Sequence, residues 1–257
     1  MAPVLERLEL DQPTFVTSGD LARILEEEGV RTSVRVVAAR LRARGWLLST
    51  DRRGVWEFAP AAVAGPFSRH DPQAPLQAFL LQHPDARCGL TFQAAAWAHG
   101  IADRVPARLE VAASDSAVAR QLPRSLSTSV FAPRLGTVTL RAVPVLAAES
   151  VLVHMAARPS AVRSWESATE WLTGLAAECS WPALSAELRG RPATVTARTG
   201  YLLEGMRPDL AASLRQLSPP KDKTWFGPRR PLLRHDSTWL IADTLLPFDP
   251  RTLEPFA

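Results

Sequence analysis

The sequence predicts an α+β protein, with a small N-terminal domain of helices and a β-hairpin followed by a larger mixed α/β domain whose C-terminal part is helical. Three observations support this prediction. Residues 1–60 contain helical periodicity followed by two short runs rich in Trp, Val and Phe. A stretch rich in Ala, Pro and Gly then follows at residues 61–75. Beyond it, β-branched segments give way to helical ones after Ala147.

The length of the chain agrees with two domains. It has 257 residues, of which 46% are hydrophobic, enough to bury a sizeable core. We expect the N-terminal domain at residues 1–62, a linker at 63–75 and the larger domain at 76–257.

The N-terminal domain should contain three helices. VLERLEL is the candidate for the first. TFVTSGDLARILEEEG predicts a helix of about three turns, capped by Thr17 or Ser18 and ended by Gly29. RTSVRVVAARLRARGW predicts the next helix, which begins at Thr32 or Ser33.

A β-hairpin is expected after these helices. The sequence WLLSTDRRGVWEFAP has two apolar runs around a polar turn, and Gly54 lies where the turn needs a positive φ. The order helix, turn, helix, hairpin is typical of a winged helix-turn-helix domain.

Charge is concentrated on the third helix and the hairpin. Residues 31–53 contain seven arginines and one acid, Asp51, whereas residues 1–30 contain seven acids and only Arg7 and Arg23 as bases. The net charge of the whole chain, +4, is less informative, because 28 of the 30 basic residues are arginine and a GC-rich genome alone could produce that bias. The local segregation therefore indicates the function better than the total does.

At about 100° per residue, the third helix divides into two faces. One face is apolar and should pack on the preceding helix: Val34, Val37, Ala38 and Leu41. The opposite strip is small: Val36, Ala39 and Ala43. Arginines flank this strip on both sides: Arg35, Arg42, Arg40 and Arg44. Small residues let a helix approach base edges in the major groove and flanking cations meet phosphates, so the pattern predicts DNA binding.

The larger domain is expected to mix helices and strands. PLQAFLLQHP and TFQAAAWAHG read as helices, the second with Thr91 as its cap and Gly100 as its stop. ARLEVAAS, LSTSVFAP and GTVTLRAVPV read as strands, and residues 147–217 as a series of helices. The last forty residues are expected to be irregular, with one strand at STWLIAD and a turn at RHDS.

No motif of known chemistry stands out, and no cofactor is expected. The five histidines have no metal-binding spacing, Cys88 and Cys179 read as buried thiols, and there is neither a GxSxG elbow nor a phosphate-binding loop. The only lysines, Lys221 and Lys223, lack the acidic partners of a nuclease site. No run is apolar enough to span a membrane and no signal peptide is recognised, so we expect a cytoplasmic protein.

The ordered set of segments resembles a known family. FVTSGDLARIL, VRVVAARLRARGWLLSTDRRGVWEFAP, GLTFQAAAWAHGI, ESVLVHMAARPS and TARTGYLLEGM are together similar to the AbiEi antitoxins of bacterial type IV toxin-antitoxin and phage-defence loci. The resemblance implies a non-enzymatic transcriptional regulator that represses its own operon by binding inverted repeats, with a nucleotidyltransferase-like toxin encoded nearby. After Leu217 the similarity is loose, and no role is carried over to that stretch.

The resemblance places the recognition helix on Thr32 to Arg44 and the wing on Thr50 to Val55. We expect base contacts from Ser33, Arg35, Val36, Ala39 and Arg40, and we include Thr32 at the helix start. We expect phosphate contacts from Arg31, Arg42, Arg44, Arg52 and Arg53. Inverted repeats imply that two copies pair on DNA, from a monomer or weak dimer in solution.

Two alternatives stay open at this point. The winged helix could dock on a partner protein as a non-catalytic adaptor, in which case salt should hardly affect binding. An enzyme with an unfamiliar site in residues 75–257 is the other.

Overall fold

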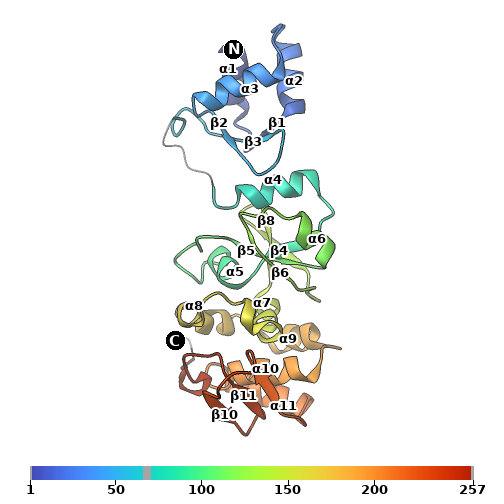
Figure 1. Ribbon diagram of the computed structural model, residues 1–257, viewed down its shortest axis with the longest axis vertical. Coiled ribbons are helices and arrows are strands. Elements are labelled where there is room, and N and C mark those ends of the chain that lie inside the picture. The colour runs from blue at the N-terminus through green and yellow to red at the C-terminus, as the bar shows by residue number, and fades with distance from the viewer. Residues whose placement is uncertain (1, 66–70, 256–257) are drawn as a thin grey trace. The chain divides into compact units, whose positions relative to one another are not determined.

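The computed structural model describes residues 2–65 and 71–255, and its chain divides into two compact units. The first unit comprises Met1–Ala86 together with Leu122–Leu126, and the second comprises Arg87–Gln121 and Ser127–Ala257. In the described residues, eleven α-helices and three β-sheets make a mixed α+β protein (Figure 1). Residues 66–70 of the expected linker, including His70, lie outside the described residues.

The first unit combines four helices with a three-stranded sheet. Its elements are, in chain order, α1 (Ala2–Asp11), β1 (Phe15–Thr17), α2 (Ser18–Glu27), α3 (Val34–Ala43), β2 (Leu47–Ser49), β3 (Val55–Phe58) and α4 (Ala74–Gln82). The strand order is β1-β3-β2, and both pairings are antiparallel. The expected helices and hairpin are all present. Strand β1 was not expected, because three residues before a helix cap carry no alternation that a pattern could reveal.

Local sequence signals fix the start of α2 and the turn of the hairpin. Thr17 is the N-cap of α2, and it forms a capping box with Asp20, whose backbone N–H donates to Thr17 Oγ1 at 3.1 Å. Gly54 has φ +75° in the β2–β3 turn, as the sequence predicted. Its carbonyl accepts the N–H of Ser18 at 2.8 Å, so the turn is bonded to the first residue of α2.

The core of the first unit lies between α1, α2, α3 and the sheet. Its buried members are Val4, Leu8, Val16, Leu21, Ile24, Leu25, Val37, Ala38, Leu41, Leu47 and Phe58. Full burial of a valine, leucine, isoleucine or phenylalanine side chain stabilises a fold by about 1.5–3 kcal/mol. The inward face of α3 is therefore fixed by packing.

The second unit contains a five-stranded sheet with the strand order β6-β5-β4-β8-β7. The strands are β4 (Cys88–Leu90), β5 (Glu110–Ala113), β6 (Ser127–Val130), β7 (Thr137–Leu140) and β8 (Val143–Leu146). Pairs β5–β6 and β4–β8 are parallel, while β4–β5 and β7–β8 are antiparallel. Two helices belong to this part, α5 (Phe92–Ala98), with Thr91 at the N-cap position as predicted, and α6 (Ser116–Gln121). The Thr91 hydroxyl bonds to His154 and not to the helix.

Five helices follow the sheet, as the sequence predicted. They are α7 (Ala148–Ala157), α8 (Trp165–Ala177), α9 (Trp181–Leu188), α10 (Ala193–Leu203) and α11 (Pro208–Leu217), with a 3-10 turn at Pro159–Ala161. Helix α7 is buried over almost its whole length, including its polar residues Glu149, Ser150 and His154. Both thiols, Cys88 and Cys179, are free and buried, as expected.

His154 of α7 is a structural histidine. Its Nδ1 lies 2.8 Å from Thr91 Oγ1 and its Nε2 3.2 Å from Ser129 Oγ. Its ring stacks on Phe131 at 4.3 Å and lies 4.4 Å from the ring of Phe92. Burial lowers the pKa of His154 to about 3, so the ring is neutral.

The C-terminal stretch is more ordered than the sequence indicated. It forms a second sheet from β9 (Thr224–Phe226), β10 (Arg234–Asp236) and β11 (Ile241–Asp243), followed by a 3-10 turn at Pro250–Thr252. Strand β11 pairs antiparallel with β10 and parallel with β9. The expected turn at residues 234–237 was wrong over 234–236, which is a strand. Three-residue strands are too short to show an alternating pattern, so the sequence does not reveal them.

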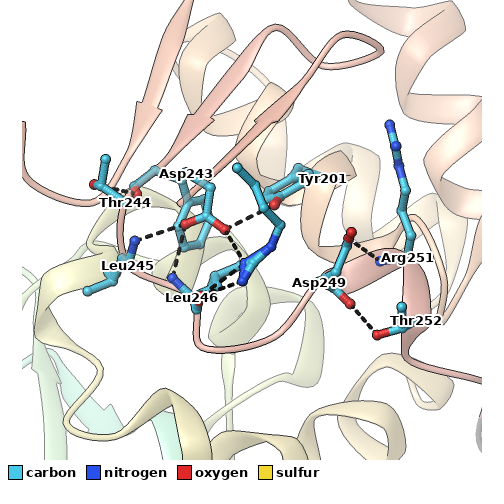
Figure 2. Close-up of polar contacts among 10 residues, drawn as sticks. Tyr201, Asp243, Thr244, Leu245, Leu246, Asp249, Arg251 and Thr252 are labelled. Carbon is cyan, nitrogen blue, oxygen red and sulfur yellow. Dashed lines mark hydrogen bonds and ion pairs between the residues drawn. The ribbon is translucent and has the colours of Figure 1, made fainter. Parts of the chain in front are cut away.

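Asp243, at the end of β11, holds this stretch together (Figure 2). Its carboxylate accepts the backbone N–H groups of Leu245 and Leu246 at 2.9 and 3.0 Å, and Arg234 pairs with it at 3.3 Å. The side chain is fully buried, and these donors compensate for its lost hydration.

Candidate nucleic-acid interface

Helix α3 presents one packed and one open face. Val37, Ala38 and Leu41 are buried against the core, and Val34 is partly buried beside them. On the other side Ala39 and Ala43 are exposed, and Val36 is 40% exposed. The two faces that the helical periodicity predicted are therefore confirmed, and no part of the described first unit covers the open strip.

All five arginines of the α3 region are exposed: Arg31, Arg35, Arg40, Arg42 and Arg44. Among the described residues, none of them forms an ion pair. Two acids of α1 and α2 pair instead within their own helices, Asp11 with Arg7 at 2.8 Å and Glu27 with Arg23 at 3.0 Å. The positive charge of α3 is thus left for an external partner.

The start of α3 is also open to solvent. Thr32 and Ser33 are both exposed, and Ser33 is the N-cap residue. In the described part of the chain its hydroxyl makes no capping hydrogen bond. The hydroxyl can therefore donate or accept without breaking a bond of the fold.

The hairpin turn places its two arginines differently. Thr50 Oγ1 donates to the carbonyl of Val55 at 2.7 Å and accepts the N–H of Arg52 at 3.2 Å, which fixes the turn. Arg53 is exposed at the tip. Arg52 is half-buried, with Cζ 4.7 Å from the ring centroid of Phe79 in α4, and burial lowers its pKa. No local pattern in the sequence indicates this contact, since Arg52 and Phe79 lie far apart along the chain.

The buried ionisable groups of the second unit serve the fold. Glu187 accepts the backbone N–H groups of Arg134 and Leu135 at 2.9 and 3.0 Å, the hydroxyl of Ser150 at 2.7 Å, and a bond from Arg191. Every part of this carboxylate therefore has a structural partner.

Glu110 is a second buried carboxyl. It is 5% exposed, and its Oε2 accepts the N–H of Ala94 at 3.2 Å. Burial raises its pKa to about 7. Within residues 2–65 and 71–255 no group of His, Cys, Asp and Glu side chains could hold a metal ion, and no helix is long and apolar enough to cross a membrane.

The fold and its surface define a two-unit α+β protein whose charge is concentrated on one solvent-exposed basic helix. Residues 86–205 match the model of the AbiEi antitoxin C-terminal domain. This part of the chain is therefore similar to the C-terminal domain of the AbiEi antitoxins, a family of non-enzymatic regulatory proteins, and the match supports an antitoxin role in a toxin-antitoxin system.

The fold is also similar to a solved structure, the crystal structure of the RV2827C protein from Mycobacterium tuberculosis. The TM-score is 0.82 at 26% sequence identity, and the alignment covers 95% of this chain and 91% of that one. The similarity therefore extends over both units. A search of curated proteins found no match.

Proposed function

We propose that this protein is an antitoxin that represses its own operon, by binding inverted repeats in its promoter through the first unit. The AbiEi domain supports the antitoxin role and implies a toxin partner. The DNA-binding part of the proposal is supported by the topology and surface of residues 1–62.

The topology of the first unit supports a winged helix-turn-helix domain. Helices α2 and α3 are joined by a short turn with Gly29 at φ +63°, and α3 leads directly into the β2–β3 hairpin. In such domains the second helix of the turn enters the major groove, and the hairpin extends along the neighbouring backbone. Helix α3 takes the first role and the turn at residues 50–54 the second.

The observation that carries the proposal is the open strip of α3 between arginines that form no ion pair with any described residue. Val36 and Ala39 can approach base edges closely, and Val36 offers an apolar contact of the kind that thymine methyl groups favour. Arg35 and Arg40 flank the strip on opposite sides and can bond to guanine edges. Ser33, and Thr32 before it, complete the base-facing set.

The remaining arginines are assigned to phosphates: Arg31, Arg42, Arg44 and Arg53. Each is exposed and can form charge-assisted bonds to the backbone. Arg52 would have to leave the ring of Phe79 to do the same, so we assign the leading wing contact to Arg53.

A gel-shift series with the DNA upstream of the gene tests this assignment. Substituting Arg35 and Arg40 by alanine should cost about 1–3 kcal/mol of binding free energy each, because each loses a base contact. The matched control is Arg229→Ala with Arg230→Ala, two exposed arginines of the second unit, which should leave affinity unchanged.

Two outcomes would count against the proposal. If the Arg35/Arg40 double variant binds as well as the parent chain, α3 is not the reading element. If raising the salt concentration does not weaken the binding of the parent chain to the upstream DNA, phosphate contacts do not hold the complex. The exposed strip then serves as a docking face for a partner protein instead.

A further inference from the structure

The second unit carries a hollow at the meeting point of α9, α10 and α11. Its volume is about 490 Å³, and its lining includes Trp181, Leu188, Thr196 and Leu217. Leu217 is 57% exposed, although it ends a helix whose other leucines, Leu210 and Leu214, are buried. Leu217 therefore adds an exposed apolar side chain to the lining of the hollow, next to which an apolar side chain from another molecule could pack.

The rim of this hollow is cationic. Arg189 and Arg191 belong to its lining, which contains no acid. The Arg134 guanidinium lies beside Gly190, which separates these two arginines in the lining. Glu187 is close by but fully buried and saturated by its own bonds, including the one from Arg191. An occupant should therefore combine an apolar side chain, which packs on the apolar part of the lining, with a carboxylate, which pairs with the arginines of the rim.

Helix α1 of the first unit has this chemistry. Leu10 is 77% exposed, more than any other large hydrophobic side chain in the described residues. Glu6 lies one turn earlier on the same face, is exposed, and forms no ion pair among the described residues. The inward residues of α1, Val4 and Leu8, leave this Glu6–Leu10 face unused by the core.

We infer that the chain associates with a second copy, Leu10 of one molecule entering the α9–α11 hollow of the other while its Glu6 pairs with Arg189. If Leu10 of each molecule enters the hollow of the other, the two contacts are identical, which is the arrangement of a dimer with two-fold symmetry. The association itself does not depend on DNA binding. Only the use of this dimer to place two molecules on inverted repeats rests on the proposed function.

Sedimentation equilibrium of the full chain without DNA tests the inference. The parent chain should show a reversible monomer–dimer equilibrium. Leu10→Asp should weaken dimerisation about tenfold or more, because a central apolar anchor is lost. Leu81→Asp is the control: this leucine is also on a helix and is 56% exposed, but it lies outside both surfaces, so the equilibrium should not move.

A charge exchange makes the test independent of folding. Glu6→Arg and Arg189→Glu should each weaken the dimer, and the double variant should recover it, since the pair is restored with reversed signs. A parent chain that stays monomeric, an unchanged Leu10→Asp dimer, or a double variant no better than the single ones would overturn the inference. Because DNA is absent, none of these results depends on promoter binding.

Discussion

The hydroxyl of Tyr201 donates a hydrogen bond of 3.0 Å to Oδ2 of Asp243 (Figure 2). Tyr201 belongs to α10, inside the AbiEi domain match, whereas Asp243 lies in the stretch beyond it. Burial, followed by the nearby charge of Asp243, raises the pKa of Tyr201, so the phenol stays protonated and can donate. The C-terminal stretch is therefore an integral part of the second unit.

Tyr201→Phe should lower the free energy of unfolding by about 1.5–3 kcal/mol, the usual effect of losing a hydrogen bond to a charged group. Urea denaturation followed by circular dichroism measures it. The control is Asp209→Asn, which removes an exposed pair with Arg207 and should cost under about 1 kcal/mol. If Tyr201→Phe and Asp209→Asn lower the free energy of unfolding equally, the buried hydrogen bond stabilises the fold no more than the exposed ion pair does.

Gly200→Ala should destabilise the second unit by about 1–3 kcal/mol through overpacking. A Cβ built on Gly200 would lie 2.1 Å from Cη2 of Trp239, a fully buried ring whose indole N–H donates to Glu204. Gly136→Ala is the matched control, because no heavy atom lies within 4 Å of its Cβ position. Thermal unfolding compares the two variants, and a Gly200→Ala melting temperature equal to that of Gly136→Ala would contradict the packing described.

Glu110→Gln should make the protein more stable at alkaline pH. The folded-state pKa of Glu110, about 7, lies above its ordinary value of 4.5, so folding favours the protonated form. Its favourable contribution is present below about pH 4.5 and is lost as the pH rises through 7. Because glutamine is neutral throughout, the gain at pH 8 should reach about 3 kcal/mol at most.

Denaturation at pH 4 and pH 8 provides the measurement. Asp115→Asn is the control with the opposite sign, since the N–H of Val118 lowers the pKa of that exposed carboxyl. It should bring no gain at pH 8. A Glu110→Gln variant whose stability follows the parent chain at both pH values would show that Glu110 is not desolvated.

Arg42→Ala should reduce the salt dependence of DNA binding. Each phosphate contact contributes about 0.9 to the slope of log K against log salt concentration, so the slope should fall by about 1 while sequence preference is kept. Fluorescence anisotropy at several salt concentrations measures this. Arg215→Ala, an exposed arginine of α11, should leave the slope as it is. An unaltered slope for Arg42→Ala would remove this residue from the phosphate-contacting set.

The first unit could be predicted from sequence because its signals are local. The cap at Thr17, the positive φ of Gly54 and the two faces of α3 each depend on a few neighbouring residues. The contacts that escaped prediction join distant residues, as Arg52 with Phe79 and Tyr201 with Asp243 do. Charge segregation indicated the exposed basic strip, but it could not show which of the two wing arginines would pack inward.

The short segment Leu122–Leu126 groups with the first unit although it is encoded within the AbiEi domain match. An exchange of Met1–Ala86 alone between relatives would leave behind these five residues, which belong to the first unit. Such a hybrid should need residues 122–126 of the same relative as well, so that the first unit keeps its own contacts.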